Sequence, residues 1–180
     1  MKTLLNDAQL DITLHRLAHQ LVENHLSFKD TVIIGIRPRG ILLSDRIAGL
    51  VKKITGNNHI GYGKLDITFH RDDVYTNELV VPESTEIPFS IEGKNVILID
   101  DVLYTGRTIR SAMDALIDVG RPKKVELLVL IDRRFSRELP IQPDYFGDTV
   151  DTITTQKVKV YWKEKDGKDE VVLIDKVSQS

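Results

Sequence analysis

The chain has 180 residues, 41% of them hydrophobic, which is enough to bury a complete core, so we expect a single domain over residues 1–180. It contains no cysteine, which excludes disulfides, thiolate catalysis and cysteine-ligated zinc. The 25 Lys and Arg against 27 Asp and Glu give a net charge of −2, which argues against strong non-specific nucleic-acid binding. The N-terminus lacks a signal-peptide core and no apolar run approaches membrane-spanning length, so we expect a cytoplasmic protein without membrane contact.

The hydrophobic pattern predicts alternating helices and strands. Apolar residues at helical spacing from Leu10 onward indicate a helix for which Asn6 or Asp7 serves as the N-cap. Two later helical stretches end at Gly56 and Gly120, as helices commonly do. In chain order we expect a helix over 10–25, a strand over 31–36, a helix over 41–54, a strand over 61–69, a mobile polar excursion over 76–90, a strand over 96–99, a helix over 108–119, a strand over 125–131 and a β-hairpin over 158–174.

The order of these elements predicts an α/β fold with a central, mostly parallel sheet, right-handed crossovers and flanking helices. In such a sheet, ligands bind beyond the carboxyl ends of the strands. Two unusual loops, at 37–40 and 100–108, both leave strands at that end. We therefore expect these loops to lie on one rim of the sheet.

The segment VILIDDVLYTGRT, residues 96–108, carries the strongest chemical signal in the chain. An apolar strand runs into Asp100 and Asp101, and the TGRT motif opens the next helix. The first amides of a helix are unpaired and lie at the positive end of its dipole, so they suit a phosphate. Gly106 lets the backbone approach closely, two threonine hydroxyls add donors, and the carboxylates can accept bonds from sugar hydroxyls. A capped helix beside a solvated acidic pair is the alternative, but the combination favours a ribose 5-phosphate site.

This segment resembles the signature with which type I phosphoribosyltransferases bind phosphoribosyl pyrophosphate (PRPP). Its form DDVLYTGRT is similar to that of the PyrR family, whose members are attenuation regulators of pyrimidine operons and also uracil phosphoribosyltransferases. The likeness covers most of the chain and includes His15–His19, Gly35–Gly40, Asp66–Asp73, Ala112–Leu116, Asp118–Pro122, Arg137–Ile141 and Asp144–Tyr145. The resemblance implies the type I fold, with a small hood over the sheet. It assigns the binding of PRPP or UMP phosphate and ribose to Asp100, Asp101, Val102, Leu103, Tyr104, Thr105, Gly106, Arg107 and Thr108.

Two further segments fit the same chemistry. The loop of Arg37, Pro38, Arg39 and Gly40 offers two guanidinium groups and free amides, which suit a leaving pyrophosphate, although a tight turn with solvated arginines is the alternative. The resemblance identifies this loop as the pyrophosphate loop of the family. Arg71, Asp72 and Asp73 form a charged stretch that is either a solvated cluster or part of a lid that keeps water from the reacting ribose. The resemblance favours the lid, with Arg71 reaching the pyrophosphate.

For the base, the resemblance implies a hood formed after the strand at 125–131 and in the C-terminal hairpin. It nominates Arg133, in the segment Asp132–Arg134 that follows this strand, and also Val158. Uracil presents two carbonyl acceptors and N–H donors, which one arginine and backbone groups can match. A solvated turn after the strand is the alternative, for Arg134 above all.

The reaction implied by the resemblance converts uracil and PRPP to UMP and pyrophosphate. Uracil N1 would attack the anomeric carbon as pyrophosphate leaves, with alignment and electrostatics as the source of catalysis. Arg71, Asp100 and Asp101 are the expected catalytic residues, since the arginine stabilises the departing charge and the carboxylates hold the ribose. His15 and His19 lie one helical turn apart without a third ligand nearby, so we expect no metal held by the protein alone. We expect Mg²⁺ to arrive with PRPP, near the acidic pair.

Two other functions remain open from the sequence. A phosphoribosyltransferase for hypoxanthine, guanine or orotate would share the fold, and an RNA-binding attenuation regulator with vestigial catalysis would share the family. The resemblance implies an RNA face on the first helix and on the loop after the strand at 125–131, where the basic residues are Arg16, His19 and Arg137. Positions at which that pattern expects charge are occupied by Asn24, Gln142 and Asp148. We therefore expect weak binding to pyrimidine operon mRNA, in a protein that the resemblance implies is a homodimer or a larger homo-oligomer.

Overall fold

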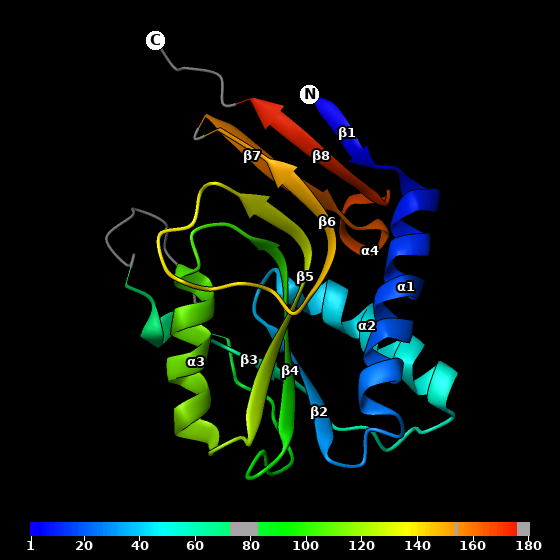
Figure 1. Ribbon diagram of the computed structural model, residues 1–180, viewed down its shortest axis with the longest axis vertical. Helices are drawn as coiled ribbons and strands as arrows, with labels where there is room; N and C mark the ends of the chain where they lie inside the picture. Colours follow the sequence, from blue (N-terminus) through cyan, green and yellow to red (C-terminus); the bar gives the residue numbers. More distant parts are fainter. Residues whose placement is uncertain (73–82, 154, 176–180) are drawn as a thin grey trace.

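The computed structural model describes residues 1–72, 83–153 and 155–175, which form two sheets with helices packed against the larger one (Figure 1). The larger sheet is parallel and has five strands in the order β3-β2-β4-β5-β6. These strands are β2 (Thr31–Ile36), β3 (Tyr62–Leu65), β4 (Asn95–Leu103), β5 (Lys124–Arg134) and β6 (Tyr145–Asp151). The smaller sheet is antiparallel, in the order β1-β8-β7, and consists of β1 (Lys2–Leu5), β7 (Gln156–Tyr161) and β8 (Glu170–Asp175).

Helices cover both faces of the larger sheet. α1 (Asp7–His25) packs beside α2 (Gly40–Thr55) on one face, while α3 (Arg107–Val119) covers the other (Figure 1). A capping box closes the start of α1, since Asn6 Oδ1 accepts the Gln9 amide at 2.9 Å and the Gln9 side chain accepts the Asn6 amide at 3.0 Å. Asn6 is therefore confirmed as the N-cap, and the predicted α/β class with a parallel sheet is confirmed as well.

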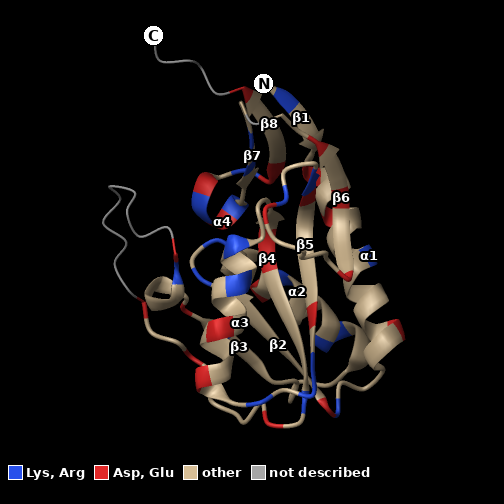
Figure 2. Ribbon diagram, turned by 60° about the vertical axis from the view of Figure 1, so that its left-hand side comes forward, with Lys and Arg blue, Asp and Glu red and all other residues tan. Residues whose placement is uncertain are grey.

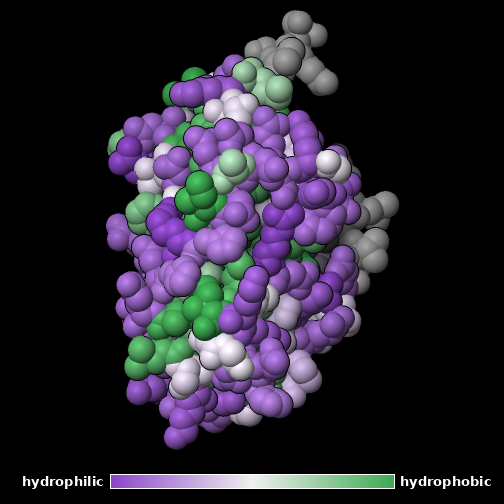
Figure 3. All heavy atoms as spheres, turned by 90° about the vertical axis from the view of Figure 1, so that its right-hand side faces the viewer, coloured by the Kyte–Doolittle hydropathy of each residue, from purple (hydrophilic) through white to green (hydrophobic). Residues whose placement is uncertain are grey.

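Both faces of the central strands are buried, so their side chains divide between two cores with a period of two residues. One core joins the strands to α1, α2 and the small sheet, and the other joins them to α3. The first includes Ile33, Ile97, Leu128, Val158, Trp162 and Val171, and the second includes Ile34, Leu98 and Val129. The outer surface on the α1 and α2 side is mainly hydrophilic, with smaller hydrophobic clusters between the polar side chains (Figure 3).

Two strand boundaries differ from prediction because pairing with a neighbour, rather than local sequence, decides them. The strand expected over 96–99 continues as β4 to Leu103. The strand expected over 125–131 continues as β5 to Arg134. The two strands pair with each other as far as Leu103 and Asp132, so polar residues predicted to lie in loops are held in the sheet.

The region after β3 also differs from prediction. The strand expected over 61–69 ends at Leu65, and a single 3₁₀ turn, Thr68–His70, follows it. The excursion expected over 76–90 lies partly outside the described residues, since 76–82 are among those not described. The remainder runs alongside β3, where Lys64 and Glu86 form an antiparallel bridge.

The predicted C-terminal hairpin is confirmed, but its connection holds a short helix, α4 (Lys163–Asp166), and Trp162 lies beyond the end of β7. β1 and β6 were not predicted. β1 is a short edge strand that forms by pairing with β8, at the other end of the chain. Among the described residues, no helix is both long and apolar enough to cross a membrane.

A buried polar cluster lies near the start of β5, at the amino end of the parallel strands. Glu126 is 7% exposed and accepts hydrogen bonds from His25 at 2.7 Å, Lys124 Nζ at 2.6 Å and Tyr145 Oη at 2.9 Å. Burial raises the pKa of Glu126, but the bonds from Lys124, His25 and Tyr145 outweigh it, so the pKa lies below its ordinary value. The cluster ties α1 to β5 and β6, far from the two loops.

Candidate active site

The loops after β2 and β4 meet at the carboxyl ends of these neighbouring strands, which confirms the prediction of a common rim. The strands pair in parallel, with Gly35 opposite Ile99. At Gly40, an added Cβ would lie 2.5 Å from the carbonyl oxygen of Ile99 and 3.1 Å from the Cα of Asp100. Because glycine has no Cβ, the backbone of loop 37–40 can lie directly against the acidic end of β4.

The turn that starts α3 has the shape of an anion site. Gly106, the N-cap residue, has φ of 94°, a left-handed conformation that favours glycine. Thr105 Oγ1 accepts the Arg107 amide at 3.3 Å, and no side chain of the described residues caps the helix at Gly106. The other first-turn amides lie at the positive end of the helix dipole, and Thr108 is exposed beside them. The turn therefore offers the donors that a phosphate needs.

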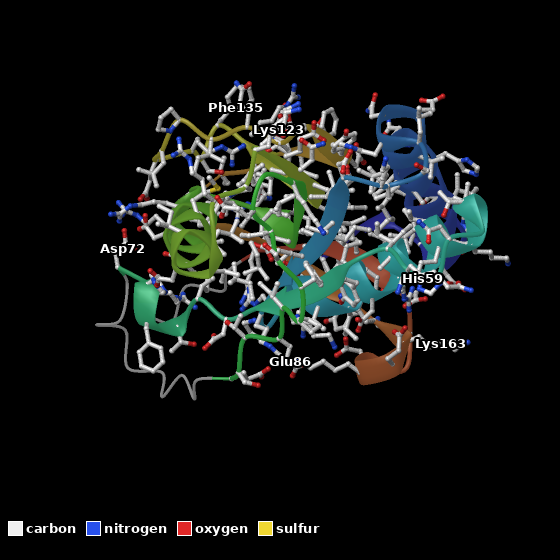
Figure 4. The ribbon with its side chains drawn as sticks, turned by 90° about the horizontal axis from the view of Figure 1, so that it is seen from below. His59, Asp72, Glu86, Lys123, Phe135 and Lys163 are labelled. Atoms are coloured by element: carbon white, nitrogen blue, oxygen red, sulfur yellow. The ribbon has the colours of Figure 1, made fainter. Side chains whose placement is uncertain are left out.

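The loop after β5 supports this turn. Thr105 O accepts the amides of Glu138 and Leu139 at 2.9 and 3.1 Å. Arg107 donates from Nε to Glu138 at 2.6 Å and from Nη1 to Asp72 at 2.9 Å. Figure 4 shows Asp72 beside α3. The Arg107 side chain thus links the turn to two other segments and is committed to their carboxylates.

The acidic pair at the end of β4 is buried, with Asp100 6% and Asp101 9% exposed. Burial, followed by the charge of Asp101, raises the pKa of Asp100 well above its ordinary value, and the charges of Arg39 and Arg71 oppose this shift. Burial also raises the pKa of Asp101, against the charge of Arg39 and neighbouring amides. Figure 2 shows the acidic end of β4 among basic segments. A positive charge brought beside the pair would lower both pKa values, so it would be bound by the ionised carboxylates.

A cavity of about 290 Å³ opens between the loop after β2, the end of β4 and the C-terminal hairpin. It brings together five residues that the sequence assigned to the site from three segments, namely Pro38, Arg39, Asp101, Val102 and Val158. The remaining lining residues were not predicted, and they are Leu42, Lys157, Lys159, Val160, Trp162, Lys165 and Asp166. The alternation of lysine and valine indicated a strand at this place, but local sequence does not show that the strand faces the end of β4 across a cavity.

Arg37 is paired with carboxylates of the segment that follows the undescribed residues. Its guanidinium forms ion pairs with Glu83 and with Glu86, the latter at 2.8 Å. Glu86 also bridges Lys64 through the backbone, and Figure 4 shows it on the segment that runs beside β3. The guanidinium expected at the pyrophosphate is therefore committed to these carboxylates, and Arg39 is the arginine of this loop that lines the cavity.

Arg133 is held within the sheet. It lies near the end of β5, and β6 pairs beside it with Val150 opposite Arg133, so the alternative of a solvated turn after the strand does not apply to this residue. The residue is 4% exposed. Its Nε donates to Thr152 Oγ1 and its Nη2 to Gln156 O, each at 3.0 Å, and the guanidinium lies 3.9 Å from the centre of the Tyr104 ring. Two of its nitrogens are thus engaged by protein groups.

Two of the basic residues expected on an RNA face are bonded to groups of the protein. Arg16, on α1, donates to backbone carbonyls of β6. Arg137 lies at the carboxyl ends of β4 and β5, where it donates to Tyr104 O at 2.6 Å and pairs with Asp132. His19 is exposed on α1. Both arginines are therefore engaged within the protein itself.

A metal would find few protein ligands here. Among the described residues, no group of three or more His, Asp or Glu side chains converges on a point. The carboxylates of Asp100 and Asp101 are hard oxygen ligands of the kind that Mg²⁺ prefers. They fit an ion that takes most of its ligands from a phosphorylated substrate and from water.

Comparison with known proteins agrees with this geometry. Residues 1–165 match the model of the phosphoribosyl transferase domain family. A protein of Elusimicrobium minutum named Bifunctional protein PyrR is 48% identical over 178 residues, which cover 98% of each chain. Proteins of the same name from Pelotomaculum thermopropionicum and Enterococcus faecalis are 48% and 43% identical, over 91% and 96% of this chain and 90% and 96% of theirs.

Solved structures share the architecture at much lower identity. The hypoxanthine phosphoribosyltransferase of Trypanosoma cruzi aligns with a TM-score of 0.73 and 16% identity over 97% of both chains. A hypoxanthine phosphoribosyltransferase of Staphylococcus aureus aligns with a TM-score of 0.71 and 20% identity, over 95% of this chain and 90% of the other. At these identities the likeness concerns the fold alone.

Proposed function

The chain belongs to the phosphoribosyltransferase family, with the type I fold and with PyrR proteins as near-full-length relatives, and we propose that it transfers the phosphoribosyl group of PRPP to uracil. The products are UMP and pyrophosphate. One observation carries the proposal: the cavity of about 290 Å³ joins Arg39, Asp101 and Val158, which come from distant parts of the sequence. We assign these residues to the pyrophosphate, ribose and base ends of the reaction.

We assign the 5-phosphate of PRPP or UMP to the turn at 105–108. Its uncapped amides, the conformation of Gly106 and the helix dipole all favour an anion. The double substitution Thr105→Ala with Thr108→Ala should weaken the binding of Mg²⁺–PRPP by about 1.5–3 kcal/mol for each lost bond to the charged phosphate. Calorimetry that gives unchanged affinity for a folded double variant would remove this assignment.

For the pyrophosphate we propose Arg39, Arg71 and the backbone of loop 37–40. Arg39 lines the cavity, and the charges of both arginines act on Asp100. Mg²⁺ bound with PRPP would neutralise charge on the pyrophosphate, with Asp100 and Asp101 as the carboxylates that the protein offers to the ion or to the ribose hydroxyls.

For the base we propose the wall that contains Val158. Val158 lies on β7, whose backbone can present both N–H and C=O groups to the carbonyls and N–H groups of uracil. Arg133 adjoins this wall, since its Nη2 donates to Gln156 O at the start of β7.

The proposed reaction is a displacement at the anomeric carbon. The bond between ribose C1′ and a pyrophosphate oxygen breaks as a bond from C1′ to uracil N1 forms, and the N1 proton passes to pyrophosphate or to water. The carboxylates of Asp100 and Asp101 favour the positive charge that develops on the ribose, while Arg39 and Arg71 hold the departing anion. Alignment of the two substrates contributes the rest, and we assign no side chain as a general base.

A steady-state assay with Mg²⁺, PRPP and one base at a time tests the proposal. We expect UMP formation from uracil, with kcat/KM at least about tenfold lower for hypoxanthine, guanine and orotate. Arg39→Glu should depress turnover but leave UMP binding nearly unchanged, because UMP carries no pyrophosphate. Turnover with a different base would correct the substrate, and absence of turnover with every base would refute the enzymatic function.

We propose further that RNA binding is weak in this chain, although its relatives are named bifunctional. Arg16 and Arg137 are bonded to groups of the protein itself, and Asp148 is exposed on β6, where it would repel phosphate. Each missing phosphate contact lowers both the affinity and its salt dependence. A filter-binding titration against the leader RNA of its own pyrimidine operon, at physiological salt with UMP present, measures this. Tight, sequence-selective binding would restore the dual role.

A further inference from the structure

Arg133 occupies a buried position between two segments of the proposed site. The residue is 4% exposed, and burial lowers the pKa of its guanidinium. On one side lies Tyr104, directly before the phosphate turn. On the other side lie Thr152, directly after β6, and Gln156, at the start of β7.

The guanidinium contacts these segments in two different ways. Its face lies over the Tyr104 ring, 3.9 Å from the ring centre, in a cation–π contact. Its edge donates from Nε to Thr152 Oγ1 and from Nη2 to Gln156 O, each at 3.0 Å. Because the group is planar and rigid, these contacts hold the Tyr104 segment and the start of β7 in a fixed relation.

The start of β7 is also the start of the base wall. Gln156 is the first residue of β7, and the next two, Lys157 and Val158, line the cavity. The Val158 side chain is buried in the core, so the position of this wall depends on where the strand begins. On the opposite side, Arg137 Nη1 steadies the phosphate segment by donating to Tyr104 O at 2.6 Å.

We infer that Arg133 is a positioning residue, which sets the wall at Val158 against the phosphate turn without itself contacting the base. The inference rests on the proposed function, because it takes the base to lie against that wall. It differs from the role that the family resemblance implies, in which Arg133 reads the base directly. The indirect role follows from geometry, since the Nε–Nη2 edge of the guanidinium is already used by Thr152 and Gln156 and Tyr104 covers one face.

The test is the binding of UMP, followed by tryptophan fluorescence and by calorimetry. Trp162 is the only tryptophan of the chain and lines the cavity, so its emission reports on this wall. Thr152→Val and Tyr104→Leu each remove one partner while the arginine stays. Arg133→Lys keeps the charge but loses the planar edge and face. Arg134→Met, at the exposed neighbouring residue, is the control.

We expect Thr152→Val, Tyr104→Leu and Arg133→Lys each to raise the Kd for UMP at least about fivefold, the loss expected for one hydrogen bond or cation–π contact. The affinity for Mg²⁺–PRPP should stay within about twofold of the unaltered protein in Thr152→Val and Arg133→Lys, and Arg134→Met should change neither value. If Arg133→Lys alone weakens UMP binding, the arginine reads the base directly and the inference is overturned.

Equal losses of UMP and PRPP binding in Thr152→Val and Arg133→Lys, with both variants folded by circular dichroism, would also overturn the inference, because they indicate a general structural role. The proposed function fails by a separate result. If the unaltered protein binds UMP but does not convert uracil, the enzymatic proposal is wrong, while selective loss of UMP binding in Thr152→Val and Tyr104→Leu still supports the positioning role.

Discussion

Asp100 combines a proposed catalytic role with an unfavourable burial, and the substitution Asp100→Asn separates the two. Asparagine has nearly the same shape, and its side-chain oxygen can still accept the Asp101 amide, a bond of 2.9 Å that is worth about 1 kcal/mol. The substitution removes a buried carboxyl group whose pKa is raised by burial and by the charge of Asp101. The charges of Arg39 and Arg71 offset this rise only in part, so the ionised form destabilises the fold. We expect the free energy of unfolding near neutral pH to rise by about 1–2 kcal/mol. Turnover should fall about 100-fold or more, because the developing charge on the ribose loses a carboxylate.

The pH dependence of this gain follows from the direction of the shift. A carboxyl group with a higher pKa in the folded state than in the unfolded chain destabilises the fold once the pH exceeds the unfolded value of about 4. The penalty grows through the window between the two pKa values and is constant above the folded one. Asparagine does not titrate, so the stability gain of Asp100→Asn should be absent near pH 4 and reach its full size above the folded pKa.

Urea unfolding followed by circular dichroism, at several pH values between about 4 and 8 and without ligands, measures this gain. Asp114→Asn, at a half-exposed position on α3, is the control and should change stability by less than about 0.5 kcal/mol. A loss of stability in Asp100→Asn near neutral pH, or a gain of the same size at every pH, would show that burial of this charge is not what strains the site.

Two further pairs of variants test the packing. Gly40→Ala should lower the free energy of unfolding by about 1–3 kcal/mol and disable PRPP binding, because its Cβ would lie 2.5 Å from a carbonyl oxygen of β4. In the same helix, a Cβ at Gly49 meets nothing within 4 Å, so Gly49→Ala should raise the free energy of unfolding by up to about 1 kcal/mol. Thermal unfolding measures the stability of both variants, and calorimetry measures their PRPP binding. Glu126→Gln should lower the free energy of unfolding by about 2–4 kcal/mol near neutral pH, against less than about 1 kcal/mol for Asp151→Asn in an exposed ion pair. Because the pKa of Glu126 is lowered in the fold, this loss should be full above about pH 4 and shrink as the pH falls through the folded value, which urea titrations at successive pH values measure.

The conformation of the turn at 105–108, to which we assign the 5-phosphate, could be predicted because its determinants lie within one short segment. A glycine with positive φ, an apolar strand before it and a helix after it are all encoded between 96 and 108, and the structure has Gly106 at φ of 94° and α3 starting at Arg107. The common rim could be predicted as well, since parallel strands bring their carboxyl ends to one edge. The structure agrees with this prediction, because the backbone at Gly40 lies directly against the end of β4.

The unpredicted elements depend on partners that are distant in the sequence. Tyr145–Asp151 has little β-branched character, yet it forms β6 because β5 offers it an edge to pair with. Asp132 to Arg134 are polar and were expected to follow the strand rather than to belong to it, but the same pairing extends β5 through them. Local sequence records a preference for strand or turn, and it holds no information on which edge is available.

The ion-pair partners of the arginines are the feature of the site that is hardest to predict from the sequence, because a long side chain reaches whichever carboxylate the fold brings near it. In the RPRG loop, the sequence treats Arg37 and Arg39 alike. In the structure Arg37 forms ion pairs with Glu83 and Glu86, while Arg39 lines the cavity that Asp101 also lines. The two guanidinium groups therefore have different contacts. Replacement of Arg39 removes positive charge where the pyrophosphate is proposed to leave, whereas replacement of Arg37 first loosens the segment held beside β3.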